Sequence, residues 1–182
     1  MRTMVSGEGD ASNTGCASIS LAVMPGAEAW APTPAELSPV ACSLRGSIQV
    51  QIWPRRDLPR VWAQDNPGRP IPGGTHGFRA YTRDRVVKLF VDPAETRDSV
   101  LWLLHHELAH VGVTQTPGLV QSLRRSPRPD GYPHDDEAHE RHPEERHANA
   151  VADAWMALLG RPVGLDRRWW RGRVKSLAYR RP

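Results

Sequence analysis

The stretch LLHHELAHVG, from Leu103 to Gly112, places His106, Glu107 and His110 in the order H-E-x-x-H within an apolar run. Residues four apart on an α-helix lie on one face, so both imidazoles can point at a single metal ion. Glu107 adjoins the first histidine and can reach a water molecule bound to that ion, which makes it a candidate general base rather than a ligand. The spacing therefore predicts a helix that carries two metal ligands and one base.

The residues around this motif have the pattern of a longer helix. Apolar side chains recur at helical spacing between residues 100 and 111, and Asp92 or Asp98 is the candidate N-cap. The alternative is an ordinary amphipathic helix that contains histidines, because short motifs of this kind also occur by chance. A third ligand decides between the two, since a catalytic zinc site needs three protein ligands and one open position.

A second helix is predicted from Pro143, a residue favoured in the first helical turn, to Gly160, after which Pro162 stops it. Glu145 and Asn149 lie four apart on this helix and share a face. Glu145 can complete the metal site, and Asn149 can hydrogen-bond the outer nitrogen of a ligating histidine. We therefore expect this helix to fold back against the first.

Other histidines near these motifs leave an alternative open. His134, His139 and His142 lie in an acidic segment, and one of them can supply a third imidazole in place of Glu145. His105 is rotated by about 100° from the first ligand around the helix, so we expect it to pack or to meet solvent.

Together the two motifs resemble a known family. H-E-x-x-H followed by E-x-x-A-N-x-x-A, from Glu145 to Ala152, is similar to the gluzincin metallopeptidases, and most similar to their ImmA/IrrE-like branch of bacteria, phages and mobile elements. The resemblance covers about residues 47 to 160. It implies a zinc metalloendopeptidase in which His106, His110 and Glu145 bind Zn²⁺, Glu107 activates water, and the substrate is a protein or peptide.

The chain also departs from that branch. Val151 stands where the branch often has phenylalanine, and the residues from Trp155 onward lack its usual Leu-Met-Pro ending. No helix-turn-helix region is evident, so the resemblance does not extend to a particular substrate.

The region before the first motif contains strand patterns. SIQVQIW, Ser47 to Trp53, alternates apolar and polar residues as a half-buried strand does. HGFRAYT and RVVKLFV flank Arg83 and Asp84 and predict an antiparallel hairpin, without an Asn-Gly turn signal. With the two helices they predict an α+β class: a small zincin-like domain over residues 45–160, with a short antiparallel or mixed sheet packed on the H-E-x-x-H helix.

Length and composition limit the number of domains and the cellular setting of the protein. The length of 182 residues suits one domain with tails, and residues 1–44, rich in small residues and proline, are expected to form a flexible leader. Only Cys16 and Cys42 occur, too few for a disulfide framework, so a reduced cytoplasmic setting is expected. The apolar segment Ala17 to Met24 is too short to span a bilayer, and no membrane partner is expected.

Residues 161–182 form a basic segment with eight Lys and Arg residues against the single acid Asp166. Phosphate attraction and base stacking are both available to such a segment. It predicts a nucleic acid or an acidic partner, and its candidate contact residues are Arg167, Arg168, Trp169, Trp170, Arg171 and Arg173. A solvated tail whose tryptophans pack on the domain is the alternative. The competing function is thus a nucleic-acid-associated or scaffold protein with a structural zinc, although the intact Glu107 argues against lost chemistry.

Overall fold

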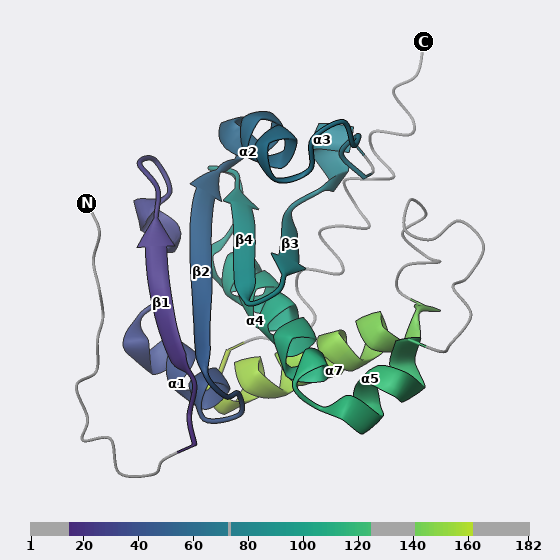
Figure 1. The fold of residues 1–182 in the computed structure, drawn as a ribbon. Helices are drawn as coiled ribbons and strands as arrows, with labels where there is room; N and C mark the ends of the chain where they lie inside the picture. Colours follow the sequence, from purple (N-terminus) through teal and green to yellow (C-terminus); the bar gives the residue numbers. More distant parts are fainter. Residues whose placement is uncertain (1–14, 73, 125–140, 162–182) are drawn as a thin grey trace.

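The computed structural model describes residues 15–72, 74–124 and 141–161 as a small α+β domain (Figure 1). Its sheet is mixed, in the order β1-β2-β4-β3. The pairs β1–β2 and β2–β4 are parallel, and β3 pairs with β4 in antiparallel orientation. The strands are β1 (Ser18–Val23), β2 (Ser47–Pro54), β3 (Ala80–Arg83) and β4 (Val86–Val91).

The alternation of β2 is confirmed, since Ile48, Val50 and Ile52 are buried in the main core. The opposite face of the sheet has a smaller core, in which Phe90 of β4 packs with Leu58 and Val61. This second cluster is covered by α2 (Leu58–Asp65), which follows the short 3-10 helix η2 (Arg55–Asp57). A short helix, α3 (Gly74–Gly77), leads into β3.

The predicted hairpin is also confirmed. β3 and β4 pair from Arg83↔Val86 to Ala80↔Leu89. Asp84 sits in the turn with φ of 54°, in the left-handed region that Asp tolerates better than most residues. Asp84 thus adopts the left-handed conformation in a turn that lacks an Asn-Gly pair.

The prediction of a flexible leader over residues 1–44 is wrong from Ser18 onward. β1 pairs with β2 along its whole length, from Ser18↔Ser47 to Val23↔Ile52. The chain then forms a 3-10 helix, η1 (Glu28–Trp30), and α1 (Pro34–Ala41), which begins with a capping box between Thr33 and Glu36. β1 does alternate, with Ile19, Leu21 and Val23 packed against the core, but the strand is short, lies at a sheet edge and is embedded in a segment rich in small residues.

In the part of the chain that the structure describes, the sheet is followed by α4 (Arg97–Thr114), α5 (Pro117–Arg124) and α7 (Pro143–Leu158). The N-cap of α4 is Thr96, whose side chain accepts from the Ser99 N–H, and not Asp92 or Asp98 as expected. α4 packs against β3 and β4 and also against α7, which explains why residues are buried around most of its circumference. Within the described residues, no helix has the length and apolar character needed to cross a membrane.

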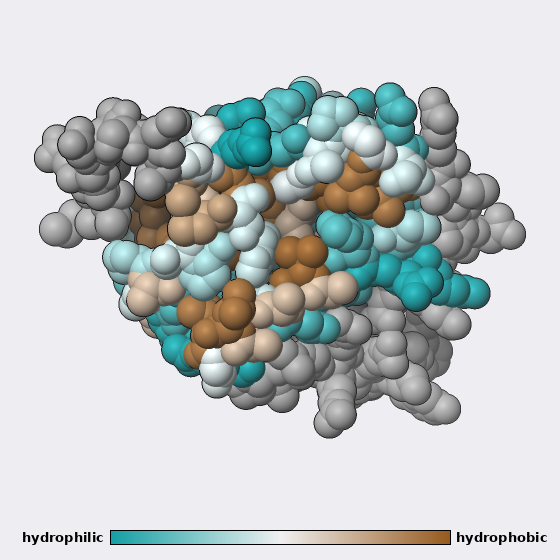
Figure 2. Space-filling model, turned by 90° about the horizontal axis from the view of Figure 1, so that it is seen from below, coloured by the Kyte–Doolittle hydropathy of each residue, from teal (hydrophilic) through white to brown (hydrophobic). Residues whose placement is uncertain are grey.

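Arginine–carboxylate pairs fasten these elements together. Glu36 of α1 accepts from Arg97 at 2.6 Å and from Arg161 at 3.1 Å, and Arg161 also reaches Asp98 at 2.7 Å. Arg161, the first residue of the predicted basic tail, is therefore part of the folded domain. On the face seen from below, apolar residues form several patches interrupted by polar ones (Figure 2). Leu158, near the end of α7, is the large apolar side chain most exposed in the described chain.

Candidate metal centre

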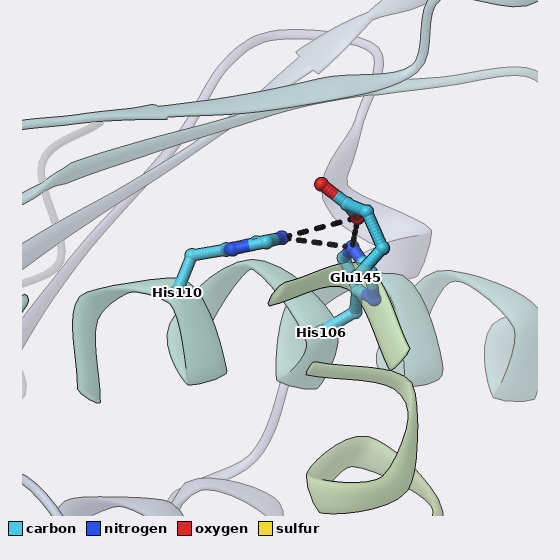
Figure 3. Close-up of side chains that lie close together, drawn as sticks. All are labelled: His106, His110 and Glu145. Atoms are coloured by element: carbon cyan, nitrogen blue, oxygen red, sulfur yellow. Dashed lines mark hydrogen bonds and ion pairs between the residues drawn. The ribbon is translucent and has the colours of Figure 1, made fainter. Parts of the chain in front are cut away.

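Three side chains from two helices converge at the crossing of α4 and α7 (Figure 3). His106 and His110 lie one turn apart on α4, and their Nε2 atoms are 3.1 Å apart. Glu145 comes from the first turn of α7, and its Oε2 lies 3.2 Å from Nε2 of His106 and 3.4 Å from Nε2 of His110. Together these residues form a group that can hold a metal ion.

The spacing of the three donor atoms fits a tetrahedral ion. Ligands bonded at about 2.0–2.1 Å to a tetrahedral centre lie roughly 3.3–3.4 Å from one another. The three separations here, 3.1, 3.2 and 3.4 Å, are close to that value. Two imidazole nitrogens and one carboxylate oxygen are also a donor set that first-row divalent metals accept. These three residues would therefore provide three ligands to a four-coordinate ion and leave its fourth position to another ligand.

The position of Glu145 follows from how α7 begins and packs. Pro143 occupies the first turn, and His142 caps the helix by accepting from the Glu144 N–H at 3.3 Å. Ala148 and Ala152 are fully buried, and their small side chains let α7 approach α4 closely. The start of α7 therefore comes to lie opposite the two histidines.

The outer nitrogens of both histidines are hydrogen-bonded. Asn149 Oδ1 lies 3.0 Å from Nδ1 of His106, which is the contact expected from the sequence. Glu144 Oε1 lies 3.2 Å from Nδ1 of His110. With each Nδ1–H donating to these oxygens, the Nε2 lone pairs face the centre of the site.

Glu144 is a residue that the sequence analysis missed. It precedes Glu145 by one position, and successive residues of a helix point about 100° apart. One carboxylate can therefore face the centre while its neighbour reaches the outer side of a histidine. The pair of adjacent glutamates was a signal for this arrangement, although it could not say which histidine each would meet.

The site is electronegative. Burial alone lowers the pKa of His110, but hydrogen bonds to Glu144 and Glu145 and the charges of Glu145 and Glu107 outweigh burial and raise that pKa to about 10. A group of carboxylates that holds a proton this firmly also favours a metal cation in its place.

His106 is held by an aromatic contact as well. The Trp102 ring stacks on the His106 ring with centroids 5.4 Å apart and planes 28° apart. The Trp102 indole N–H donates to Asp153 Oδ1 of α7 at 2.8 Å. Trp102 is buried, so its ring contact and its hydrogen bond to α7 restrain the position of His106.

The candidate base, Glu107, lies beside the sheet. Its carboxylate Oε2 accepts from the Thr82 hydroxyl at 2.7 Å, and only 8% of Glu107 is exposed. Thr82 belongs to β3, an edge strand of the sheet as described. Nothing in the sequence pointed to Thr82, because the contact joins residues 25 positions apart through tertiary packing.

The remaining candidates lie elsewhere or outside the described residues. His105 was expected either to pack or to meet solvent, and it packs in the interior. Its Nε2 lies 3.2 Å from the Glu36 carbonyl oxygen, and its ring contacts Trp155. Burial lowers the pKa of His105 to about 4. His142 is the cap of α7 rather than a member of the metal group. His134 and His139, like Arg167, Arg168, Trp169, Trp170, Arg171 and Arg173, lie outside the described residues.

Comparisons with protein-family models, curated proteins and solved structures found no match to this chain. Function must therefore be inferred from the site itself.

Proposed function

We propose that the protein is a zinc-dependent metallopeptidase of the gluzincin type, similar to the ImmA/IrrE-like branch. His106, His110 and Glu145 hold Zn²⁺ in this proposal, and Glu107 is the general base. The observation that carries it is the near-tetrahedral spacing of the three donor atoms, with a buried glutamate adjoining the first histidine. A structural site alone does not require that glutamate.

Zinc supplies Lewis acidity when bound, lowering the pKa of a water molecule to about 7 and polarising a carbonyl group. Glu107 takes the proton of the attacking water at its carboxylate and passes it to the leaving amine. The hydroxyl of Thr82 fixes one carboxylate oxygen by a hydrogen bond, so the carboxylate is oriented before the substrate arrives. Asn149 and Glu144 keep the two imidazoles from rotating.

The edge strand β3 supports a peptide as the substrate. β4 occupies one side of β3, and Thr82 of this strand contacts Glu107. An extended peptide can add to such an edge through backbone hydrogen bonds, which position it without demanding much sequence. A peptide bound there lies next to the general base.

The decisive experiment measures zinc binding by equilibrium dialysis and peptide cleavage by a proteomic screen, on the full chain, two site variants and one control variant. Glu145→Ala should lower the zinc affinity sharply. The loss should exceed the roughly 10–100-fold expected when a hydrogen-bond partner of a ligating histidine is removed. Glu107→Gln should retain zinc and lose turnover, because only the base is gone. Glu28→Gln, at an exposed carboxylate in η1 far along the chain from both motifs, is the control and should change neither quantity.

Two outcomes would contradict the proposal. Undiminished zinc binding by Glu145→Ala, with loss in a His134, His139 or His142 variant instead, would move the third ligand out of α7. Zinc binding without cleavage by the parent chain would favour the structural-zinc alternative.

A further inference from the structure

The only two cysteines of the chain meet at a place unconnected with the metal site. Cys16 lies two residues before the start of β1 at Ser18, and Cys42 is the C-cap residue of α1. Their Sγ atoms are 3.1 Å apart, although 26 positions separate them in sequence. Both are thiols, and both are exposed.

The backbone holds this pair together. The Ala17 N–H donates to the Ala41 carbonyl at 2.7 Å, so a hydrogen bond joins the residue after one cysteine to the residue before the other. The Ser18 N–H donates to the Gly46 carbonyl at 2.9 Å and anchors the same strand start. A disulfide has an S–S distance of about 2.05 Å, so closure requires a sulfur movement of roughly 1 Å while the backbone pairing stays.

Small reagents can reach both sulfurs. A surface hollow of about 420 Å³ is lined by Gly15, Cys16 and Cys42 together with residues 43–46. This segment includes Arg45, whose cationic side chain suits a reagent that carries carboxylates. The backbone of Arg45 is fixed by two hydrogen bonds of 2.8 Å with the Gln115 side chain, so the hollow has a rigid wall.

We propose that Cys16 and Cys42 are a redox-modification site that forms a reversible intramolecular disulfide by exchange with a low-molecular-weight disulfide such as glutathione disulfide. The thiol of Cys16 donates its hydrogen bond to Cys42, and this bond raises the pKa of Cys16. Cys42, the acceptor, is therefore the attacking group once it has lost its proton to solvent.

The exchange proceeds in two balanced steps. The Cys42 thiolate attacks one sulfur of the reagent, the reagent S–S bond breaks, and one glutathione thiolate leaves. Cys16 then loses its proton and attacks the Cys42 sulfur of the mixed disulfide, which releases the second glutathione. Two protein thiols are oxidised, and one external disulfide is reduced to two thiols.

The new bond ties the start of β1 to the end of α1, which lie near each other in the fold (Figure 1). α1 carries Glu36, which pairs with Arg97 and Arg161 and whose carbonyl oxygen contacts His105. Oxidation therefore restrains the element on which these contacts depend. Closing this loop removes freedom from the unfolded chain and should raise Tm by roughly 5–15 °C.

The test equilibrates the full chain with buffers of reduced and oxidised glutathione, both in native conditions and in urea. Free thiols are counted with a thiol reagent, and the cross-linked peptide is identified by mass spectrometry. We expect a bond between Cys16 and Cys42, loss of both thiols, and an equilibrium constant for oxidation on the order of 100-fold higher in the native chain than in urea. Cys16→Ser and Cys42→Ser, at exposed positions, should each stop at a mixed disulfide and show no rise in Tm.

Three results would overturn the proposal. These are separate glutathione adducts on both cysteines, disulfide-linked dimers, or an oxidation constant no higher in the native chain than in urea. None of these outcomes depends on metal or peptidase activity, so this inference stands or fails apart from the proposed function.

Discussion

The outer hydrogen bonds of the two histidines should set the zinc affinity, and their removal gives a graded prediction. Asn149→Ala removes the 3.0 Å contact with His106, and Glu144→Ala removes the 3.2 Å contact with His110. Loss of an outer partner typically costs about 10–100-fold in affinity, which corresponds to about 1.4–2.7 kcal/mol. Because both histidines belong to one donor group, with Nε2 atoms 3.1 Å apart, the effect of the double variant should differ from the product of the single effects.

Asn149 is neutral and Glu144 is charged, so variants at Glu144 can distinguish orientation of the histidine ring from electrostatic attraction of the metal ion. Glu144→Gln keeps an acceptor oxygen and loses only the charge, so it should weaken zinc less than Glu144→Ala does. Ala150→Ser, at an exposed neighbour of Asn149 on α7, is the control for general disturbance of the helix. Competition with a chromophoric chelator measures each affinity. Equal affinities for the parent, Asn149→Ala and Glu144→Ala would refute the idea that these contacts orient ligands.

Three further predictions concern stability and the basic segment. Arg79 and Glu95 form a buried ion pair at 2.7 Å, so Arg79→Met should lower the free energy of unfolding in urea by about 3–5 kcal/mol. Arg60→Met is the control, because Arg60 pairs with Asp57 at 3.8 Å on the surface, and it should change the free energy of unfolding by under about 1 kcal/mol. Similar losses in the two variants would contradict the argument from burial. Burial lowers the pKa of His105 from about 6.5 in the unfolded chain to about 4 in the folded chain. The neutral, buried His105 therefore contributes its full share to the free energy of unfolding above about pH 6.5. About 3 kcal/mol of that free energy is lost as the pH falls from about 6.5 to about 4. His105→Phe should flatten this part of the stability–pH curve, and an unchanged slope would assign it to other groups. Deleting residues 166–182 should weaken a salt-dependent affinity for single-stranded or duplex nucleic acid. Absence of binding by the full chain at about 50 mM salt would contradict the prediction that this segment binds nucleic acid.

The helices of the site were predictable because helical spacing alone decides which residues share a face. The i, i+4 relation placed both histidines on one side of α4, and the same relation placed Glu145 and Asn149 on one side of α7. The predicted start of the second helix at Pro143 is also confirmed. These are local properties, and they survived folding because no stronger tertiary preference opposed them.

The missed features are all relations between distant segments. β1 is a parallel partner of β2, and the residues between the two strands form η1 and α1, so its pairing leaves no hairpin signal. Thr82 reaches Glu107 only because α4 packs on β3. The approach of Cys16 to Cys42 depends on β1 joining the sheet, which the expected flexible leader did not allow.

The position of α7 explains how donor atoms from distant segments acquire suitable spacing. Its first turn contacts the histidines through Glu144 and Glu145, its middle contacts Trp102 through Asp153, and the residues after its end reach Asp98 through Arg161. Contacts at three levels along the helix resist both sliding and rotation against α4, and the buried alanines between them leave little room for either movement. The carboxylate of Glu145 is therefore held in place by the fold, because contacts along the whole of α7 fix the helix that carries it. Holding the side chains in place beforehand lowers the ordering cost of binding, so the fold favours binding of a metal ion by this group.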